Sequence, residues 1–206
     1  MNGAEALFME ELIMKLWTVQ PISVLERLEQ NQVYRCDESL CGWNDTEEHL
    51  QAHQWMARQL EQRVSAPPEG VKFPLWAWHT TYGKHEAPDF RKSMFRRYED
   101  QRVCIELDIP DDKVLLSDYD AWQEVLNDEY IDFALSEEDY RLERANYESL
   151  MPEEQLEVKV KSWERAFGIL PYRNNWRRIG FFVQACFWEI KLEYVKSVRR
   201  LRSKGK

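Results

Sequence analysis

A carboxylate, Glu189, stands in the middle of an apolar and aromatic segment near the end of the chain, "FFVQACFWEIKLEYVKSVRRL" (181–201). If this segment is a strand, Glu189 lies on the same face as Ala185 and Phe187, because side chains alternate between the two faces of a strand. A carboxylate that ends an apolar face must be paired, lie at the rim, or take part in chemistry. Two interpretations of Glu189 therefore stay open: an ion pair or solvent contact at a strand end, and a functional site.

Basic and amide side chains gather in a second segment, "PYRNNWRR" (171–178). Such side chains beside an aromatic ring are typical of contacts with phosphate groups or single-stranded nucleic acid. An equally open alternative is a solvated loop whose arginines pair with the acidic remainder of the protein. The candidate nucleic-acid contacts in this segment are Arg173, Asn174, Arg177 and Arg178.

Two further groups of residues have metal-binding side chains. His49 and His53 are four residues apart on a predicted helix, which can place two imidazoles on one face, but no third ligand lies at a recognisable spacing. Glu106, Asp108 and Asp118 could serve a metal-dependent nuclease. The polar face of a strand already explains Glu106 and Asp108, so we expect no metal site.

The turn "LLSDYDAW" (115–122) places Ser117, Asp118 and Asp120 in front of a predicted helix. Side-chain oxygens at such a position accept hydrogen bonds from the free N–H groups of the first helical turn. Helix capping therefore explains these residues without a ligand. The chain has only seven glycines and carries no Gly-rich phosphate loop, nucleophile elbow or kinase signature.

Charge is divided unevenly along the 206 residues. Residues 171–206 hold ten Lys/Arg and two acidic residues, a net charge of +8, which leaves −17 on residues 1–170. A basic edge on an acidic body suits an anionic ligand or docking between the two parts. No stretch approaches the roughly 18 apolar residues of a membrane span, and the start lacks the basic region of a secretory signal. With few, irregularly spaced cysteines, this predicts a cytoplasmic protein without a membrane contact.

Hydrophobic periodicity predicts the order of the elements. Strands are expected at 16–20, 33–36, 73–79, 102–110, 180–190 and 194–201, and helices after Pro21, over 46–64, from about Asp120 through Phe133, and from Pro152 to Phe167. Segment 136–150 is charged and has no strong apolar face. A content of 44% hydrophobic and 13% aromatic residues suffices for the core of one domain. We therefore expect one α+β domain over 14–206, preceded by a flexible extension, 1–13.

Several blocks of the sequence resemble an uncharacterised bacterial family that is known as a domain of unknown function. The blocks are "MKLWTVQP" (14–21), "VYRCD" (33–37), "FPLWAW" (73–78), "CIELDIPDDKVLLSDYDAW" (104–122) and "VQACFWEI" (183–190). They span nearly the whole chain from Met14, but the resemblance by itself implies no chemistry.

The order of the predicted elements, with a late strand that ends at Glu189, is more distantly similar to the ADP-ribosyltransferase fold. This resemblance implies a split, mostly antiparallel β-sheet with flanking helices that binds NAD. It implies that Thr18 or Gln20 on the first strand contacts the cofactor and that Arg35 neutralises its pyrophosphate. Glu189 would be catalytic, since a carboxylate beside the ribose stabilises the oxocarbenium character that develops as nicotinamide leaves. The aromatic residues implied to stack on a ring of the cofactor are Trp76 and Trp78.

The function that this resemblance implies is that of an NAD-dependent ADP-ribosyltransferase-like toxin in a toxin–antitoxin or phage-defence system. Its acceptor would be a nucleic acid received by the basic loop 171–178, and an antitoxin protein would hold it in check. The alternative is a non-catalytic regulatory protein that uses the same fold to bind a nucleotide or a partner.

Overall fold

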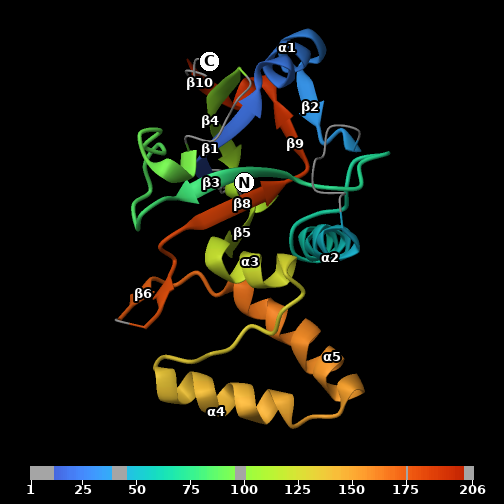
Figure 1. Ribbon diagram of the computed structural model, residues 1–206. Coiled ribbons are helices and arrows are strands. Elements are labelled where there is room, and N and C mark those ends of the chain that lie inside the picture. The colour runs from blue at the N-terminus through green and yellow to red at the C-terminus, as the bar shows by residue number, and fades with distance from the viewer. Residues whose placement is uncertain (1–11, 39–45, 96–100, 175, 202–206) are drawn as a thin grey trace, which may run out of the picture.

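The computed structural model describes residues 12–38, 46–95, 101–174 and 176–201 (Figure 1). Its strands are β1 (Ile13–Pro21), β2 (Val33–Arg35), β3 (Leu75–Thr80), β4 (Arg102–Pro110), β5 (Leu115–Asp118), β6 (Tyr172–Arg173), β7 (Arg178–Ile179), β8 (Val183–Phe187), β9 (Glu189–Lys191) and β10 (Val195–Arg200). Its α-helices are α1 (Ile22–Asn31), α2 (Glu47–Arg63), α3 (Tyr119–Leu126), α4 (Glu137–Glu148) and α5 (Pro152–Ser162), and the 3₁₀ helix η4 (Trp163–Phe167) continues α5. The expected extension, 1–13, lies mostly outside the described residues, and β1 begins at Ile13.

The scaffold is a six-stranded sheet in the order β10-β4-β1-β3-β8-β5. Each pair of neighbouring strands in it is antiparallel. The longest pairing joins β1 to β4, from Ile13 opposite Pro110 to Pro21 opposite Arg102. Two short pairs, β2 with β9 and β6 with β7, form separate two-stranded sheets. The prediction of a single α+β domain with a mostly antiparallel sheet is therefore confirmed.

One face of the sheet is covered by α1 and by the β2–β9 pair. Val24 and Leu28, two of the apolar residues that share one face of α1, are buried against Leu16 of β1 and against the alternating apolar residues of β4. That helix ends at Asn31: the N–H of the next residue, Gln32, still donates to the carbonyl of Leu28, and its left-handed backbone (φ 65°) stops the helix there. Local periodicity of 3.6 and 2 thus positions this layer as expected.

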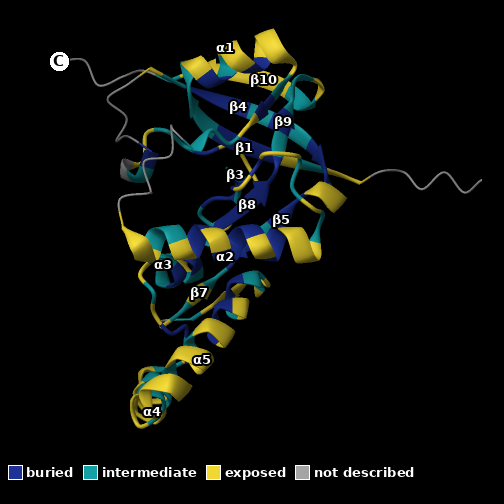
Figure 2. Cartoon of the chain, turned by 90° about the vertical axis from the view of Figure 1, so that its right-hand side faces the viewer, coloured by how far each residue is buried: buried dark blue, intermediate teal, exposed yellow. Residues whose placement is uncertain are grey.

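The opposite face of the sheet is covered by α2, α3 and η4. Trp55, Met56 and Leu60 of α2 pack with Trp122 of α3 and Trp163 of η4 in a second buried cluster. Figure 2 shows the buried residues of the sheet behind α2, whose outer side is exposed. The two apolar layers therefore enclose the sheet from both sides.

The late strand departs from the prediction at Trp188. β8 stops at Phe187, and β9 resumes at Glu189 in the small sheet with β2. Ala185, Phe187 and Ile190 share one core, whereas Trp188 belongs to the cluster on the other face, where its Nε1 donates to Ser65 O at 2.7 Å. The expectation that Glu189 continues the face of Ala185 and Phe187 was therefore wrong, because the chain changes sheets at Trp188 and Ile190 takes that place.

The predicted helix through Phe133 is also shorter than expected. α3 ends at Leu126, and Asp128 adopts a left-handed backbone (φ 56°) that ends helical continuation. Phe133, expected to point inward from this helix, is 62% exposed in the segment that follows.

Helices α4 and α5 form an arm that extends away from the sheet (Figures 1 and 2). No residue of α4 is buried, and Leu156 and Val160 of α5 are exposed. Glu143 holds α4 near the body by accepting a hydrogen bond from Phe133 N at 2.9 Å. None of the described helices is long and apolar enough to cross a membrane.

Candidate functional site

The cofactor candidates on β1 are bonded within the sheet. Thr18 is 1% exposed, and its Oγ1 donates to Trp76 O at 2.7 Å. Gln20 Nε2 in turn donates to the same Oγ1 at 2.8 Å. Both polar side chains therefore have hydrogen-bond partners within the sheet, as is usual for buried polar groups.

The two tryptophans proposed to stack on the cofactor stack instead on other side chains. The Trp76 ring lies 5.0 Å from the Trp122 ring, and both of these rings contact the imidazole of His53 edge-on. Trp78 contacts the rings of Phe95, Tyr119 and Phe182, of which the Tyr119 centroid is the nearest, at 5.1 Å. Core packing explains both rings.

Arg35 and Glu189 are brought directly together. They are register partners in the β2–β9 pair, and Arg35 Nε and Nη2 lie 3.0 and 2.9 Å from Glu189 Oε2. Both belong to the small sheet, whereas Thr18 and the two tryptophans belong to the six-stranded sheet. Glu189 also lines a cavity of about 250 Å³ beside Trp188 and Tyr194.

The side chains of the basic loop mostly hold the neighbouring chain in place. Asn174 Oδ1 accepts from the backbone N–H groups of Trp176 and Arg177, and its Nδ2 donates to Leu135 O. Arg177 Nη1 donates to Asp132 O at 2.8 Å and lies 3.2 Å from the carboxylate of the same residue. These two candidate nucleic-acid contacts therefore fix segment 132–135.

The other two basic candidates are more open. Arg173 is exposed, and Arg178 is exposed with its guanidinium 5.2 Å from the centre of the Phe181 ring. Neither makes an ion pair with a described residue within 4 Å.

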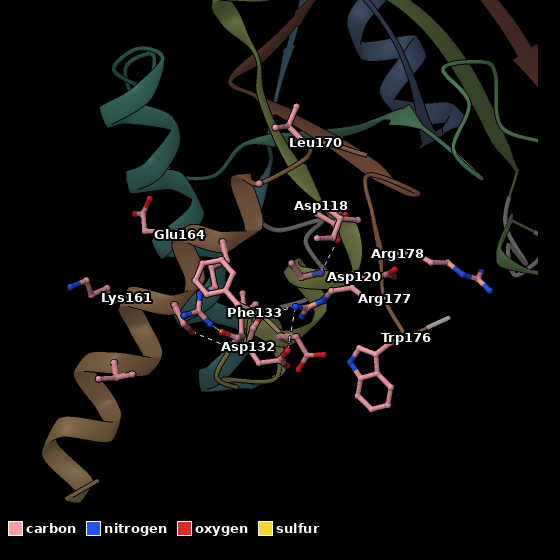
Figure 3. Close-up of a pocket in the computed structure, with 18 residues that line it drawn as sticks. Asp118, Asp120, Asp132, Phe133, Lys161, Glu164, Leu170, Trp176, Arg177 and Arg178 are labelled. Carbon is pink, nitrogen blue, oxygen red and sulfur yellow. Dashed lines mark hydrogen bonds and ion pairs between the residues drawn. The ribbon is translucent and has the colours of Figure 1, made fainter. Parts of the chain in front are cut away.

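Two segments that stood out in the sequence meet across a pocket of about 900 Å³ (Figure 3). Asp118 and Asp120 come from the turn "LLSDYDAW", and Arg177 and Arg178 come from the loop "PYRNNWRR". Other parts of the wall come from α3, α5 and η4. The remaining lining residues are Ala121, Glu124, Ile131, Asp132, Phe133, Val158, Lys161, Ser162, Glu164, Arg165, Gly168, Leu170, Trp176 and Ile179.

Asp118 is the structural anchor of this pocket. It is 4% exposed; its Oδ1 accepts from Ala121 N at 3.0 Å, which caps α3, and its Oδ2 accepts from Gly180 N at 2.7 Å. Gly180 has a φ of 67°, and a Cβ there would meet Ile169 O at 2.6 Å, so only glycine suits this position. The predicted capping role of Asp118 is confirmed, with a second bond that ties α3 to the start of β8.

Several other charges in the pocket wall are also engaged. Glu164 pairs with Arg63, outside the pocket. Arg165 donates to Ile131 O, and its guanidinium stacks 3.5 Å from the centre of the Phe133 ring. These side chains build the wall, so they are less free to bind a charged ligand.

Asp120 and Glu124 differ from these residues, since neither belongs to an ion pair within 4 Å among the described residues. Desolvation in the pocket wall, reinforced by the charge of Asp118, raises the pKa of Asp120, while Arg178 opposes this rise. Desolvation and then Glu129 raise the pKa of Glu124. The pocket thus presents two carboxyl groups four residues apart on α3.

Glu124 was not singled out in the sequence. The signal that could have identified it is its i, i+4 spacing from Asp120, which places the two side chains on one face of the helix. Trp122 and Val125 of the same helix face the core.

Apolar side chains surround the mouth of the pocket. Phe133, Leu170 and Trp176 are 62%, 84% and 44% exposed. Exposed apolar side chains grouped around a concave surface mark binding sites more often than isolated ones do.

The two histidines weighed as metal ligands both lie on α2, where His53 is buried and His49 is half-buried. His53 is 5% exposed between aromatic rings, and burial lowers its pKa to about 4. Among the described residues, no group of three or more His, Cys, Asp or Glu side chains has a geometry that could hold a metal ion.

Comparisons with known proteins add a family to this geometry. No curated protein and no solved structure matches the chain. A family model matches residues 15–196, nearly the whole domain, and the chain therefore belongs to the family described as "Domain of unknown function (DUF3841)".

Proposed function

We propose that this protein is a non-catalytic, partner-binding regulatory protein whose binding site is the 900 Å³ pocket between α3, α5 and the loop 176–179. The partner is another protein that inserts a segment in which a Lys or Arg lies next to large apolar residues. The observation that supports this proposal is the combination, in one pocket, of the carboxyl groups of Asp120 and Glu124 with exposed Phe133 and Trp176.

The distribution of charge argues for a cationic rather than an anionic ligand. Arg177 is occupied by Asp132, and Arg165 by backbone carbonyl groups and the Phe133 ring. Lys161 and Arg178 also line the pocket and make no ion pair within 4 Å with a described residue, so a phosphate would meet two cations, but it would also approach Asp120 and Glu124. A Lys or Arg side chain of the ligand would instead form an ion pair with these carboxylates. The ion pair would favour their charged forms, which desolvation in the pocket wall disfavours.

Size and surface character argue for a protein segment. A volume of about 900 Å³ is at the upper end of small-molecule sites. The apolar residues at its mouth are the kind that anchor a partner when they become desolvated. Exposed Val158 of the arm continues this apolar surface along α5.

The test is a binding assay with labelled peptides of defined composition. Peptides that combine Leu and Trp with Lys or Arg are compared, by fluorescence polarisation, with peptides of the same apolar content in which Glu replaces the bases. Saturable binding of the basic set, weakened at least about fivefold by Phe133→Ser or Trp176→Ala, is expected. Leu142→Ser is the matched control, because Leu142 is 63% exposed on α4 but does not line the pocket.

Two results would contradict the proposal. One is equal binding of the acidic and basic peptides, and the other is binding of the basic peptides that the pocket variants leave unchanged. A nucleotide that binds the same pocket more tightly than the peptides would overturn it in favour of the nucleotide-binding alternative.

A second candidate is transfer of ADP-ribose from NAD with Glu189 as the catalytic carboxylate. It is favoured by the position of Glu189 in the wall of a cavity beside the rings of Trp188 and Tyr194. Transfer of label from NAD to DNA, RNA or protein, lost in Glu189→Gln, would support it. Growth arrest that Glu189→Gln relieves would add the role of a toxin, controlled by an antitoxin. A folded sample that neither binds nor hydrolyses NAD excludes this candidate.

A further inference from the structure

The cavity beside Glu189 is distinct from the partner pocket and carries an inference of its own. It measures about 250 Å³ and lies where β8 ends and the chain changes sheets. Its lining residues are Ser65, Ala66, Pro68, Ile109, Lys113, Phe187, Trp188, Glu189, Lys191 and Tyr194.

The base of this cavity is apolar and fixed. Ile109 and Phe187 are each 1% exposed, and Trp188 is 6% exposed. The Trp188 indole is held by its hydrogen bond to Ser65 O, which joins the break between β8 and β9 to the loop after α2. An aromatic ring that enters the cavity therefore meets preformed apolar walls.

The charged groups around the cavity are predominantly positive. Glu189 is neutralised by the two contacts from Arg35. Within 4 Å, the ammonium groups of Lys113 and Lys191 form ion pairs with Asp112 at 3.4 Å and Glu193 at 3.7 Å, both outside the lining, and the Lys191 ammonium also lies 5.6 Å from the centre of the Tyr194 ring. Pairs as exposed as these are weak, so an anion can displace them.

We propose that this cavity binds a small aromatic carboxylate of one or two rings. The ring lies against Phe187, Trp188 and Tyr194, and the carboxylate accepts hydrogen bonds from Lys113 and Lys191. The volume sets the size of the ligand, because about 250 Å³ is below the ~300–1,000 Å³ of pockets for larger organic ligands. The proposal does not depend on the partner pocket, which shares no lining residue with this cavity.

The test follows the fluorine NMR signal of para-fluorobenzoate on titration with the full chain. We expect saturable broadening, and we expect Lys113→Gln and Lys191→Gln each to weaken binding by about fivefold, as for loss of one charged hydrogen bond in a partly exposed site. Lys84→Gln is the matched control, because Lys84 is also exposed but follows Gly83, whose N–H donates to Phe181 O near the opposite end of β8. Circular dichroism establishes that each variant is folded.

Para-fluorobenzamide, the neutral isostere, separates this inference from the NAD hypothesis. We expect it to bind at least about fivefold more weakly than the carboxylate, since it lacks the charge that the lysines recognise. Equal or tighter binding of the amide overturns the proposal, as does the absence of saturable binding or an unchanged affinity in both lysine variants. The peptide assay on the partner pocket has its own readout, so either proposal can fail alone.

Discussion

Arg35 Nε and Nη2 both donate to one oxygen of Glu189, at 3.0 and 2.9 Å, across the register pair that joins β2 to β9. The two residues are 154 positions apart in the chain. The resemblance to the ADP-ribosyltransferase fold implied that they contact different parts of NAD, the pyrophosphate and the ribose, whereas in the structure each neutralises the charge of the other. An ion pair, one of the two open interpretations of Glu189, describes this contact.

The contribution of this pair to stability is expected to be small. The side chains are 44% and 23% exposed, so Arg35→Gln and Glu189→Gln should each lower the free energy of unfolding by no more than about 1 kcal/mol. A double-mutant cycle in urea should give a coupling energy of about 0.5 kcal/mol. A coupling energy indistinguishable from zero would mean that the pair does not persist in solution.

Asp118 should be far more sensitive than its neighbour Asp120. Asp118→Asn keeps one acceptor oxygen but turns an NH₂ group toward the N–H of either Ala121 or Gly180, both of which now donate to the carboxylate. One buried donor is then left unsatisfied, and the free energy of unfolding should fall by about 1–3 kcal/mol. Urea denaturation of the purified variant measures this loss.

Asp120→Asn is the matched control for that experiment. The pKa of Asp120 is raised, so its charged form is disfavoured in the folded protein and removal of the charge should cost little at neutral pH. We expect a change within about 0.5 kcal/mol. An equal loss of unfolding free energy in the two variants would mean that the negative charge of the turn, rather than the two hydrogen bonds that Asp118 accepts from the backbone, stabilises the fold.

Local patterns predicted the parts of the fold that depend on near neighbours. The alternation of apolar and polar residues along 102–110 predicted the strand β4, and the apolar stripe through Trp55, Met56 and Leu60 predicted the helix α2. The charged segment 136–150 contains α4, which has no buried residue, so hydrophobic periodicity could not reveal it. Its signal is instead at its start, where Ser136 accepts a hydrogen bond from Asp139 N.

The site was less predictable because it depends on contacts between distant segments. Two-residue periodicity cannot show that the chain changes sheets at Trp188. The hydrogen bond that accompanies this change, from Trp188 Nε1 to Ser65 O, joins residues 123 positions apart in the chain. Likewise, the sequence marked "LLSDYDAW" and "PYRNNWRR" separately, and only the fold brings Asp120 and Arg178 to one pocket. Thr18 and Trp76, both assigned to the cofactor by resemblance, lie on paired strands, where the Thr18 hydroxyl donates to Trp76 O.

His53 should make stability depend on pH in a defined window. Its folded pKa is about 4, below the usual 6.5, first because burial disfavours the charged imidazolium and second because His49 is near. The unfolded state therefore binds more protons between these values, so stability should fall as the pH is lowered from 6.5 to about 4, by at most about 3 kcal/mol. Urea denaturation at a series of pH values measures this slope.

His53→Gln removes the titrating group and should flatten that window, whatever its effect on stability at neutral pH. His49→Gln, one helical turn earlier and less buried, should retain most of the slope. If both variants keep the parental pH dependence, another group is responsible for it.

Binding of basic peptides to the large pocket should also depend on pH, because Asp120 and Glu124 must be ionised to attract a cation. Both have raised pKa values, so part of their charge is lost at a pH where ordinary carboxyl groups remain ionised. Peptide affinity should therefore increase as the pH rises through these raised values and level off above them. Polarisation titrations at several pH values measure this trend.

In the double variant Asp120→Asn, Glu124→Gln, the pH dependence of peptide affinity should disappear. The affinity itself should fall by about tenfold, as for loss of one or two charged hydrogen bonds. A pH profile that survives in this double variant would mean that other carboxylates bind the peptide.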